Sequence, residues 1–179
     1  QYREAIATFD RLGEGDSEEA LTSRADLATT LQNLGRLDEA EVLHREVLER
    51  QRRRLGPNTA EVAATINNLG VVLGQRGDWK GAETFHREAL DIIRRVKGPR
   101  DPDVASALTT VASAMESQGD LSGAEVLHRE SLGLRRELLG AEHPDTVRSL
   151  YALAYLLRSR GAAREAEALC REALALRGR

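Results

Sequence analysis

The sequence predicts an all-α fold, a solenoid of antiparallel helix pairs, and two observations carry that prediction. The first is a motif that returns every 42 residues without insertions, at His44-Arg45-Glu46, His86-Arg87-Glu88, His128-Arg129-Glu130 and Cys170-Arg171-Glu172. The second is a set of small residues in the same register, namely Gly35, Gly77, Gly119, Gly161, Ala40, Ala82, Ala124 and Ala166. Units of such an array bury their apolar faces only by stacking on their neighbours. An array of this kind is usually a binding surface, which favours an interaction module over an enzyme.

Nine helices are expected along the chain, in a single repeat array over residues 1–179. Residues 2–12 form an orphan second helix, and four helix pairs follow near residues 17–54, 59–97, 101–139 and 143–177. Because the chain begins within a repeat, we expect it to be a fragment of a longer protein. The short connections make neighbouring helices antiparallel.

Start and stop signals support these boundaries. A glycine separates the two helices of each pair, where a left-handed residue commonly ends a helix. Asp78 and Asp120 follow such glycines directly and are suitable N-caps for the second helix. Apolar residues spaced by four, three and four positions predict one buried stripe on each first helix, at Val62, Ile66, Leu69 and Leu73 and at Val104, Leu108, Val111 and Met115.

The composition limits the classes of partner and location. Charged residues make up 31% of the chain and leave a net charge of -3, which argues against a nucleic-acid or anionic-membrane surface. The single cysteine, Cys170, excludes an internal disulfide and is typical of a reducing compartment, so we expect a cytoplasmic protein. No apolar run approaches the length of a membrane span, and residues 1–10 lack the apolar segment of a signal peptide.

The second repeat carries a recognisable pattern. Its segments are Ile66-Asn67-Asn68-Leu69-Gly70, Gly77-Asp78-Trp79, Ala82-Glu83 and His86-Arg87-Glu88-Ala89-Leu90, after Leu55-Gly56-Pro57. This pattern resembles a tetratricopeptide repeat of the 42-residue kinesin light chain type, and the resemblance covers essentially the whole chain. It implies a right-handed superhelix in which first helices line a concave groove and second helices form the convex back. In kinesin light chains the groove takes extended cargo peptides that contain an aromatic residue among acidic ones.

The three histidines in register, His44, His86 and His128, suggest a metal site at first sight. A zinc ion needs ligand atoms about 2 Å away, whereas equivalent atoms in stacked helices lie roughly 10 Å apart. We therefore expect these histidines to pack in the interior, and Cys170, in the same register, to act as a small buried apolar residue. No phosphate-binding loop, zinc-protease motif or nucleophile elbow is present in the sequence. The sequence accordingly predicts no catalytic, cofactor-binding or metal-binding residues.

Arginines follow two patterns. Glu41 and Arg45, and their equivalents in the later repeats, are spaced i,i+4 in the favourable order for helix-stabilising pairs. Arg50, Arg52, Arg53 and Arg54 form a basic cluster at the end of a second helix. Such a cluster can contact RNA, but cations at a helix C-terminus also favour the helix dipole, and interleaved aromatic residues are missing. We favour the second interpretation and expect no nucleic-acid partner.

Binding residues are expected on the first helices, at positions that the apolar stripe leaves unused. The candidates are Asn33, Asn67, Val71, Gln75, Thr109, Ser113, Glu116, Arg148, Tyr151, Tyr155 and Arg158. The last four are spaced three, four and three residues apart, so they share one helical face. Tyrosine beside arginine is the usual composition of an interface hot spot. An ordinary exposed surface, or tyrosines that pack against a following repeat, is the alternative.

The predicted function is a non-catalytic scaffold that binds a peptide segment of a partner protein, with acidic or aromatic character, in its concave groove. The alternative is the repeat sensor or self-association arm of a STAND-type signalling NTPase, a class in which the same long repeats occur. Terminal repeats expose apolar surface that normally stacks on further units, so end-to-end self-association is also expected in concentrated solution.

Overall fold

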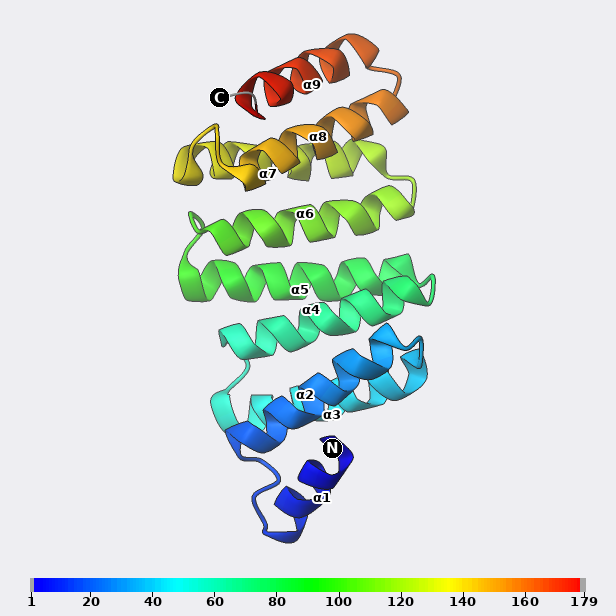
Figure 1. Ribbon diagram of the computed structural model, residues 1–179, viewed down its shortest axis with the longest axis vertical. Helices are drawn as coiled ribbons and strands as arrows, with labels where there is room; N and C mark the ends of the chain where they lie inside the picture. The colour runs from blue at the N-terminus through cyan, green and yellow to red at the C-terminus, as the bar shows by residue number, and fades with distance from the viewer. Residues whose placement is uncertain (1, 178–179) are drawn as a thin grey trace. The chain divides into compact units, whose positions relative to one another are not determined.

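The computed structural model describes residues 2–177, and these residues form α-helices joined by short connections (Figure 1). The helices are α1 (Tyr2–Arg11), α2 (Glu18–Asn33), α3 (Leu37–Leu55), α4 (Ala60–Gln75), α5 (Trp79–Lys97), α6 (Pro102–Ser117), α7 (Leu121–Leu139), α8 (Pro144–Ser159) and α9 (Ala163–Arg177). The first helices of the repeats are α2, α4, α6 and α8, and the others are second helices. None of the described helices is long and apolar enough to cross a membrane.

The chain divides into two compact units, residues 1–96 and residues 97–179, which we call the N-terminal and C-terminal units. Within the N-terminal unit, α1 packs on α2, α2 on α3 and α3 on α4. Within the C-terminal unit, α6 packs on α7, α7 on α8 and α8 on α9. The prediction of an all-α fold built from sequential helix pairs is confirmed.

The turn inside each helix pair uses one glycine and the residue after it. Gly77 has φ 85°, and the N–H of Asp78 donates to the carbonyl oxygen of Leu73 at 2.9 Å. This bond belongs to the Schellman motif that ends a helix at a left-handed glycine. Asp78 then accepts a hydrogen bond from the N–H of Gly81 at 2.9 Å and caps α5. Asp120 caps α7 through Gly123 in the same way, as the sequence predicts.

The apolar stripes lie in the core of each unit. In the N-terminal unit, Val62, Ile66 and Leu69 of the predicted α4 stripe join a cluster with residues of α3 and α5, composed of Leu48, Val62, Ala63, Ile66, Leu69, Ala89 and Ile92. Leu73, the fourth residue of the stripe, is also buried. In the C-terminal unit, Val104, Leu108, Val111 and Met115 of α6 are all buried. The alanine that recurs at the start of each second helix is also buried, which allows the two helices of a pair to approach closely.

Ion pairs connect second helices of consecutive repeats at a constant sequence offset. Four such pairs join residues 36 positions apart, namely Arg3–Glu39, Arg52–Glu88, Arg129–Glu165 and Arg136–Glu172. The predicted i,i+4 pairs are also formed in each repeat, as Glu41–Arg45, Glu83–Arg87, Glu125–Arg129 and Glu167–Arg171. Side-chain charge on the second helices is therefore largely balanced within the protein.

Candidate functional site

The three histidines in register are buried, and each meets a different environment. The Nδ1 atom of His86 lies 2.9 Å from Oδ1 of Asn67, and Nε2 of His128 lies 2.6 Å from Oε1 of Glu116. His44 is 0% exposed and neither ring nitrogen has a hydrogen-bond partner. Ala25 stands one period before Asn67 and offers no polar atom to His44. His86 and His128 thus each contact, from the buried side, a polar side chain of the predicted binding surface.

Burial decides the charge of the His44 and His86 rings. It lowers the pKa of His86 to about 4 and also lowers the pKa of His44, because a desolvated imidazolium is unfavourable. Both rings are neutral near pH 7. Within residues 2–177, no group of three or more His, Cys, Asp or Glu side chains is arranged to hold a metal ion.

The candidate binding residues of the N-terminal unit differ in the exposure and the hydrogen bonding of their side chains. Asn33 and Gln75 are the last residues of α2 and α4 and are exposed. Val71 is half-buried, and the side-chain oxygen Oδ1 of Asn67 is hydrogen-bonded to His86. The Asn67 amide still has N–H donors for an incoming group.

The polar candidates on α6 of the C-terminal unit also have internal partners. The Thr109 hydroxyl lies 2.9 Å from Ser131 Oγ of α7, and Glu116 meets His128 of the same helix. Ser113 is exposed, and its hydroxyl donates to the Thr109 carbonyl oxygen at 3.0 Å. The contacts with α7 hold Thr109 and Glu116 in position, so this part of the surface is pre-shaped.

Arg148, Tyr151, Tyr155 and Arg158 line one hollow of about 740 Å³, which we call the α8–α9 hollow. The opposite wall belongs to α9 and consists of Ala163, Ala166, Glu167 and Cys170. Tyr155 is 61% exposed, and the guanidinium of Arg158 lies 5.2 Å from the centre of its ring, in cation–π geometry. The volume lies within the range of pockets that bind small ligands or side chains.

Sequence reasoning missed the α9 wall and one buried cation. Cys170 shares the register of the histidines that contact the first helices, which is a sequence signal for this wall. It is half-buried and lines the hollow, so the expectation of a fully buried Cys170 is wrong. Arg135 of α7 is only 4% exposed. Its guanidinium donates to Ser149 Oγ at 2.5 Å and to Ser106 Oγ at 3.3 Å, and both of these acceptors are neutral.

Two effects lower the pKa of Arg135. Burial contributes most, and the positive charge of Arg148 adds to it, while the carboxylate of Asp145 opposes the shift. The guanidinium of Arg135 therefore places positive charge close to the N-terminal half of α8. An arginine on a second helix gave no sequence signal for this arrangement, because its partners lie on two other helices.

The basic cluster at the end of α3 is matched by carboxylates. Arg50 pairs with Asp16 at 2.5 Å, Arg52 pairs with Glu88 at 2.6 Å, and Arg53 pairs with Glu49 at 2.7 Å. These contacts account for the cluster within the protein and give no support to the RNA interpretation.

The fold and its surfaces define the class of protein as a helical-repeat binding module. The tetratricopeptide repeat family matches residues 19–95, 61–137 and 123–179, and the chain belongs to this family. Tetratricopeptide repeats generally mediate protein–protein interactions and are typically non-catalytic.

Solved structures described as kinesin light chain-like are similar to this chain. The structure of BtubC (BKLC) from P. vanneervenii is 25% identical, with a TM-score of 0.87 over 99% of this chain and 70% of that chain. A second structure holds TPR-like repeats, nearly identical to one another, of a protein described as a Podospora anserina kinesin light chain. It shares 20% sequence identity with this chain, with a TM-score of 0.85 over 98% of this chain and 83% of that chain. A variant of the same repeats gives a TM-score of 0.86 at 20% identity, over 98% of this chain and 82% of that chain. A comparison with curated proteins gave no match.

Proposed function

We propose that this protein is a scaffold that binds a peptide segment of a partner protein on its first helices, with an aromatic and an acidic residue seated at α8. The observation that carries the proposal is the α8–α9 hollow, where Arg148, Tyr151, Tyr155 and Arg158 line one open space. Two tyrosines beside two arginines provide the large contact area and fixed charge that dominate binding energy in interfaces.

The chemistry of the hollow fits an aromatic side chain. Ala163 and Ala166 of α9 leave room opposite Tyr151 and Tyr155. A ring inserted there meets the faces or edges of two tyrosines, and such aromatic pairs contribute about 0.5–1.5 kcal/mol beyond the buried area. The hollow is open, so a side chain can enter while its backbone stays outside.

The charges around the hollow fit an acidic neighbour. The side chain of Arg148 is 72% exposed, and its Nη2 lies 2.7 Å from Asp145, so it still has donors for a second carboxylate. The buried guanidinium of Arg135 strengthens the positive potential at the same end of α8. A carboxylate there makes charge-assisted hydrogen bonds, which are about twice as strong as neutral ones.

The remaining candidates extend the proposed surface within each unit. In the C-terminal unit, Thr109, Ser113 and Glu116 would follow the peptide backbone along α6. In the N-terminal unit, Asn33, Asn67, Val71 and Gln75 would play the same role on α2 and α4. Amide and hydroxyl groups suit that role because they pair with backbone N–H and C=O groups without excluding the chain.

A display screen of random peptides against the protein tests the proposal. The counter-screen uses Tyr151→Ala combined with Arg148→Glu, and the matched control combines Tyr2→Ala with Arg53→Glu, the same chemical changes in the other unit. We expect enrichment of one motif with an aromatic and an acidic residue, and at least tenfold weaker binding to the first variant only. Equal binding to both variants would place the peptide elsewhere. Absence of any enriched motif from a folded sample would favour the sensor or self-association arm.

Cys170 gives an independent readout of the location. Its side chain lines the hollow, so N-ethylmaleimide attached there occupies the proposed site. We expect the enriched peptide to slow alkylation of Cys170, and the alkylated protein to lose binding at least tenfold. Cys170→Ser treated with the same reagent should keep its affinity. An alkylated protein that binds normally would contradict the proposed site.

A further inference from the structure

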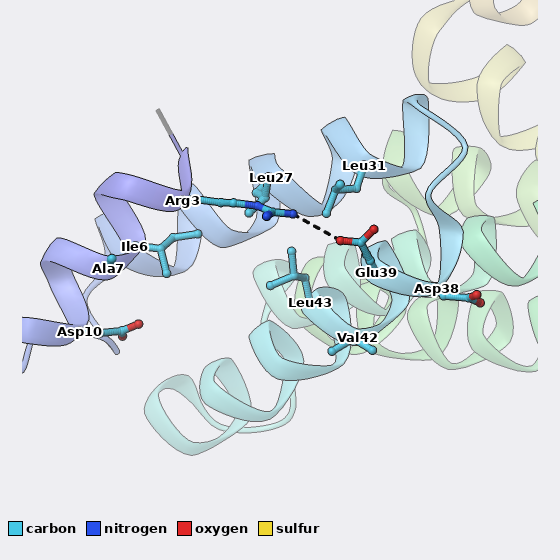
Figure 2. A pocket seen from close by; sticks show the side chains of 10 residues that line it. All are labelled: Arg3, Ile6, Ala7, Asp10, Leu27, Leu31, Asp38, Glu39, Val42 and Leu43. Atoms are coloured by element: carbon cyan, nitrogen blue, oxygen red, sulfur yellow. Dashed lines mark hydrogen bonds and ion pairs between the residues drawn. The ribbon is translucent and has the colours of Figure 1, made fainter.

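A second hollow lies in the N-terminal unit, on the side of the second helices. It measures about 530 Å³, and we call it the α1–α3 hollow. Its apolar walls come from Ile6 and Ala7 of α1, Leu27 and Leu31 of α2, and Leu43 of α3. Figure 2 shows Ile6 and Leu43 facing each other across it, while Arg3 extends from α1 to Glu39 of α3 at 3.3 Å.

The repeat register identifies the same place one period later. Residues 42 positions after Arg3, Ile6, Leu27 and Leu43 are Arg45, Leu48, Leu69 and Phe85. There the ring of Phe85 packs against the cluster that contains Leu48 and Leu69. The guanidinium of Arg45 lies over that ring, 5.8 Å from its centre. The protein itself therefore shows which side chain fits this environment.

The α1–α3 hollow lies at the position that corresponds, one period earlier, to the packing site of Phe85. Leu43 replaces the phenylalanine, while the arginine and the aliphatic neighbours are kept. An apolar cavity of about 150 Å³ already binds a benzene molecule in another protein, so this hollow has room for a ring. We propose that it receives the aromatic side chain of a partner protein segment, held beneath Arg3 and between Ile6, Leu27 and Leu43.

The register also argues against coverage by a neighbouring helix of the array. The α1 residues that line the hollow correspond to Arg45, Leu48, Glu49 and Arg52 of α3. In the repeat of α2 and α3 these four residues line an open surface made by α3 alone, and α2, the helix before α3, contributes no residue to its lining. A helix in the corresponding position before α1 would leave the hollow open in the same way.

The site is independent of the proposed peptide surface. It is lined by α1, α2 and α3 of the N-terminal unit, whereas the α8–α9 hollow belongs to the C-terminal unit. One proposal can therefore fail while the other holds.

The test is titration of the ¹⁵N-labelled protein with N-acetylphenylalaninamide, followed by amide chemical shifts. We expect saturable shifts at Ile6, Leu27 and Leu43, and at least tenfold weaker binding of N-acetylleucinamide. Leu43→Phe places a ring where Phe85 sits one repeat later and should weaken binding of the aromatic probe at least tenfold. Leu34→Phe, the same change at an exposed position, should leave binding unchanged.

Ala7→Phe provides a second block, from the α1 wall. Ala7 is exposed on α1, so this variant folds even if the larger ring at position 43 disturbs the interior. It too should weaken binding of N-acetylphenylalaninamide at least tenfold. No saturable shifts at these amides, or equal binding to the blocked variants and the Leu34→Phe control, would overturn the proposal.

Discussion

The 2.9 Å contact between His86 Nδ1 and Asn67 Oδ1 depends on the absence of a side chain at Gly70. A Cβ atom at Gly70 would lie 2.6 Å from Cε1 of the His86 ring. Ala28 holds the same register beneath His44, the histidine whose nitrogens have no partner. The glycine thus lets the ring of a second helix reach an amide of the candidate binding surface.

Replacing Gly70 by alanine should destabilise the protein despite the better helix propensity of alanine. The new methyl displaces the buried His86 ring, and overpacking of this kind costs about 1–3 kcal/mol. Gly133→Ala is the control, because a Cβ there meets nothing within 4 Å and alanine should stabilise α7 by about 0.5–1 kcal/mol. Urea unfolding of both variants measures the difference. Equal stabilisation by both would show that His86 moves freely.

Removing the amide partner of His86 should also lower stability. Asn67→Ala leaves a buried ring nitrogen unsatisfied, which costs about 1–3 kcal/mol. Asn68→Ala, on the next residue of the same helix, has the same effect on helix propensity and serves as the reference. The measurement is the difference in free energy of unfolding between the two variants at pH 7.5. A difference near zero would mean that water replaces the amide.

Acidification should destabilise the protein through His86. Its folded pKa of about 4 lies below the ordinary value of 6.5, so the unfolded chain binds the proton more tightly. The contribution of the neutral His86 ring to the free energy of unfolding is therefore fully present above pH 6.5, and it is lost as the pH falls towards 4. Between pH 7.5 and pH 5 the loss from this residue is about 2 kcal/mol.

The matched variant for the pH experiment is His86→Met, which keeps a flexible apolar side chain in the interior. Its free energy of unfolding should vary about 2 kcal/mol less between these two pH values than that of the parent protein. Identical pH profiles for the two proteins would show that other groups cause the acid sensitivity. His44, whose pKa is also lowered by burial, accounts for part of the remaining slope.

Arg24 should control the attachment of α1. Its guanidinium is only 1% exposed, contacts Asp10 at 2.5 Å and Glu46 at 3.3 Å, and donates to the Gly15 carbonyl oxygen at 3.1 Å. Arg24→Met removes all three contacts, and because the carboxylates are partly exposed we expect a loss of about 2 kcal/mol. Hydrogen exchange should then accelerate in α1 before the other helices. Arg53→Met, which breaks an exposed i,i+4 pair, should leave α1 unchanged.

The order of the helices was predictable because it depends on local signals that recur. Gly77 with Asp78 marks a helix end and a helix start whatever surrounds them. The common face of Arg148, Tyr151, Tyr155 and Arg158 followed from helical spacing alone. Each of these features is set within one helix or one turn, which is the scale that a sequence pattern reports.

The missing parts of the candidate sites depend on pairs of helices. Burial of Arg135 depends on hydroxyls of α6 and α8, and the wall around Cys170 depends on how α9 packs on α8. The α1–α3 hollow has walls on three helices, so Leu43 in place of Phe85 matters there only once α1 and α2 are in position. Burial and hollows of this kind arise from the tertiary packing of helices, so sequence periodicity could not predict them.

The constant offset of the ion pairs between second helices bears on how the gene can change. Arg52, Arg94 and Arg136 recur at the period of 42 residues, as do Glu88, Glu130 and Glu172, so a glutamate follows each arginine 36 residues later. Unequal recombination that duplicates or excises one whole period preserves this offset across the new junction. A single-residue insertion in a second helix, ahead of its glutamate, instead rotates that glutamate by about 100° around the helix and away from the arginine of the previous repeat. Array length can therefore change in whole repeats without loss of these ion pairs, whereas a one-codon insertion inside a second helix breaks them.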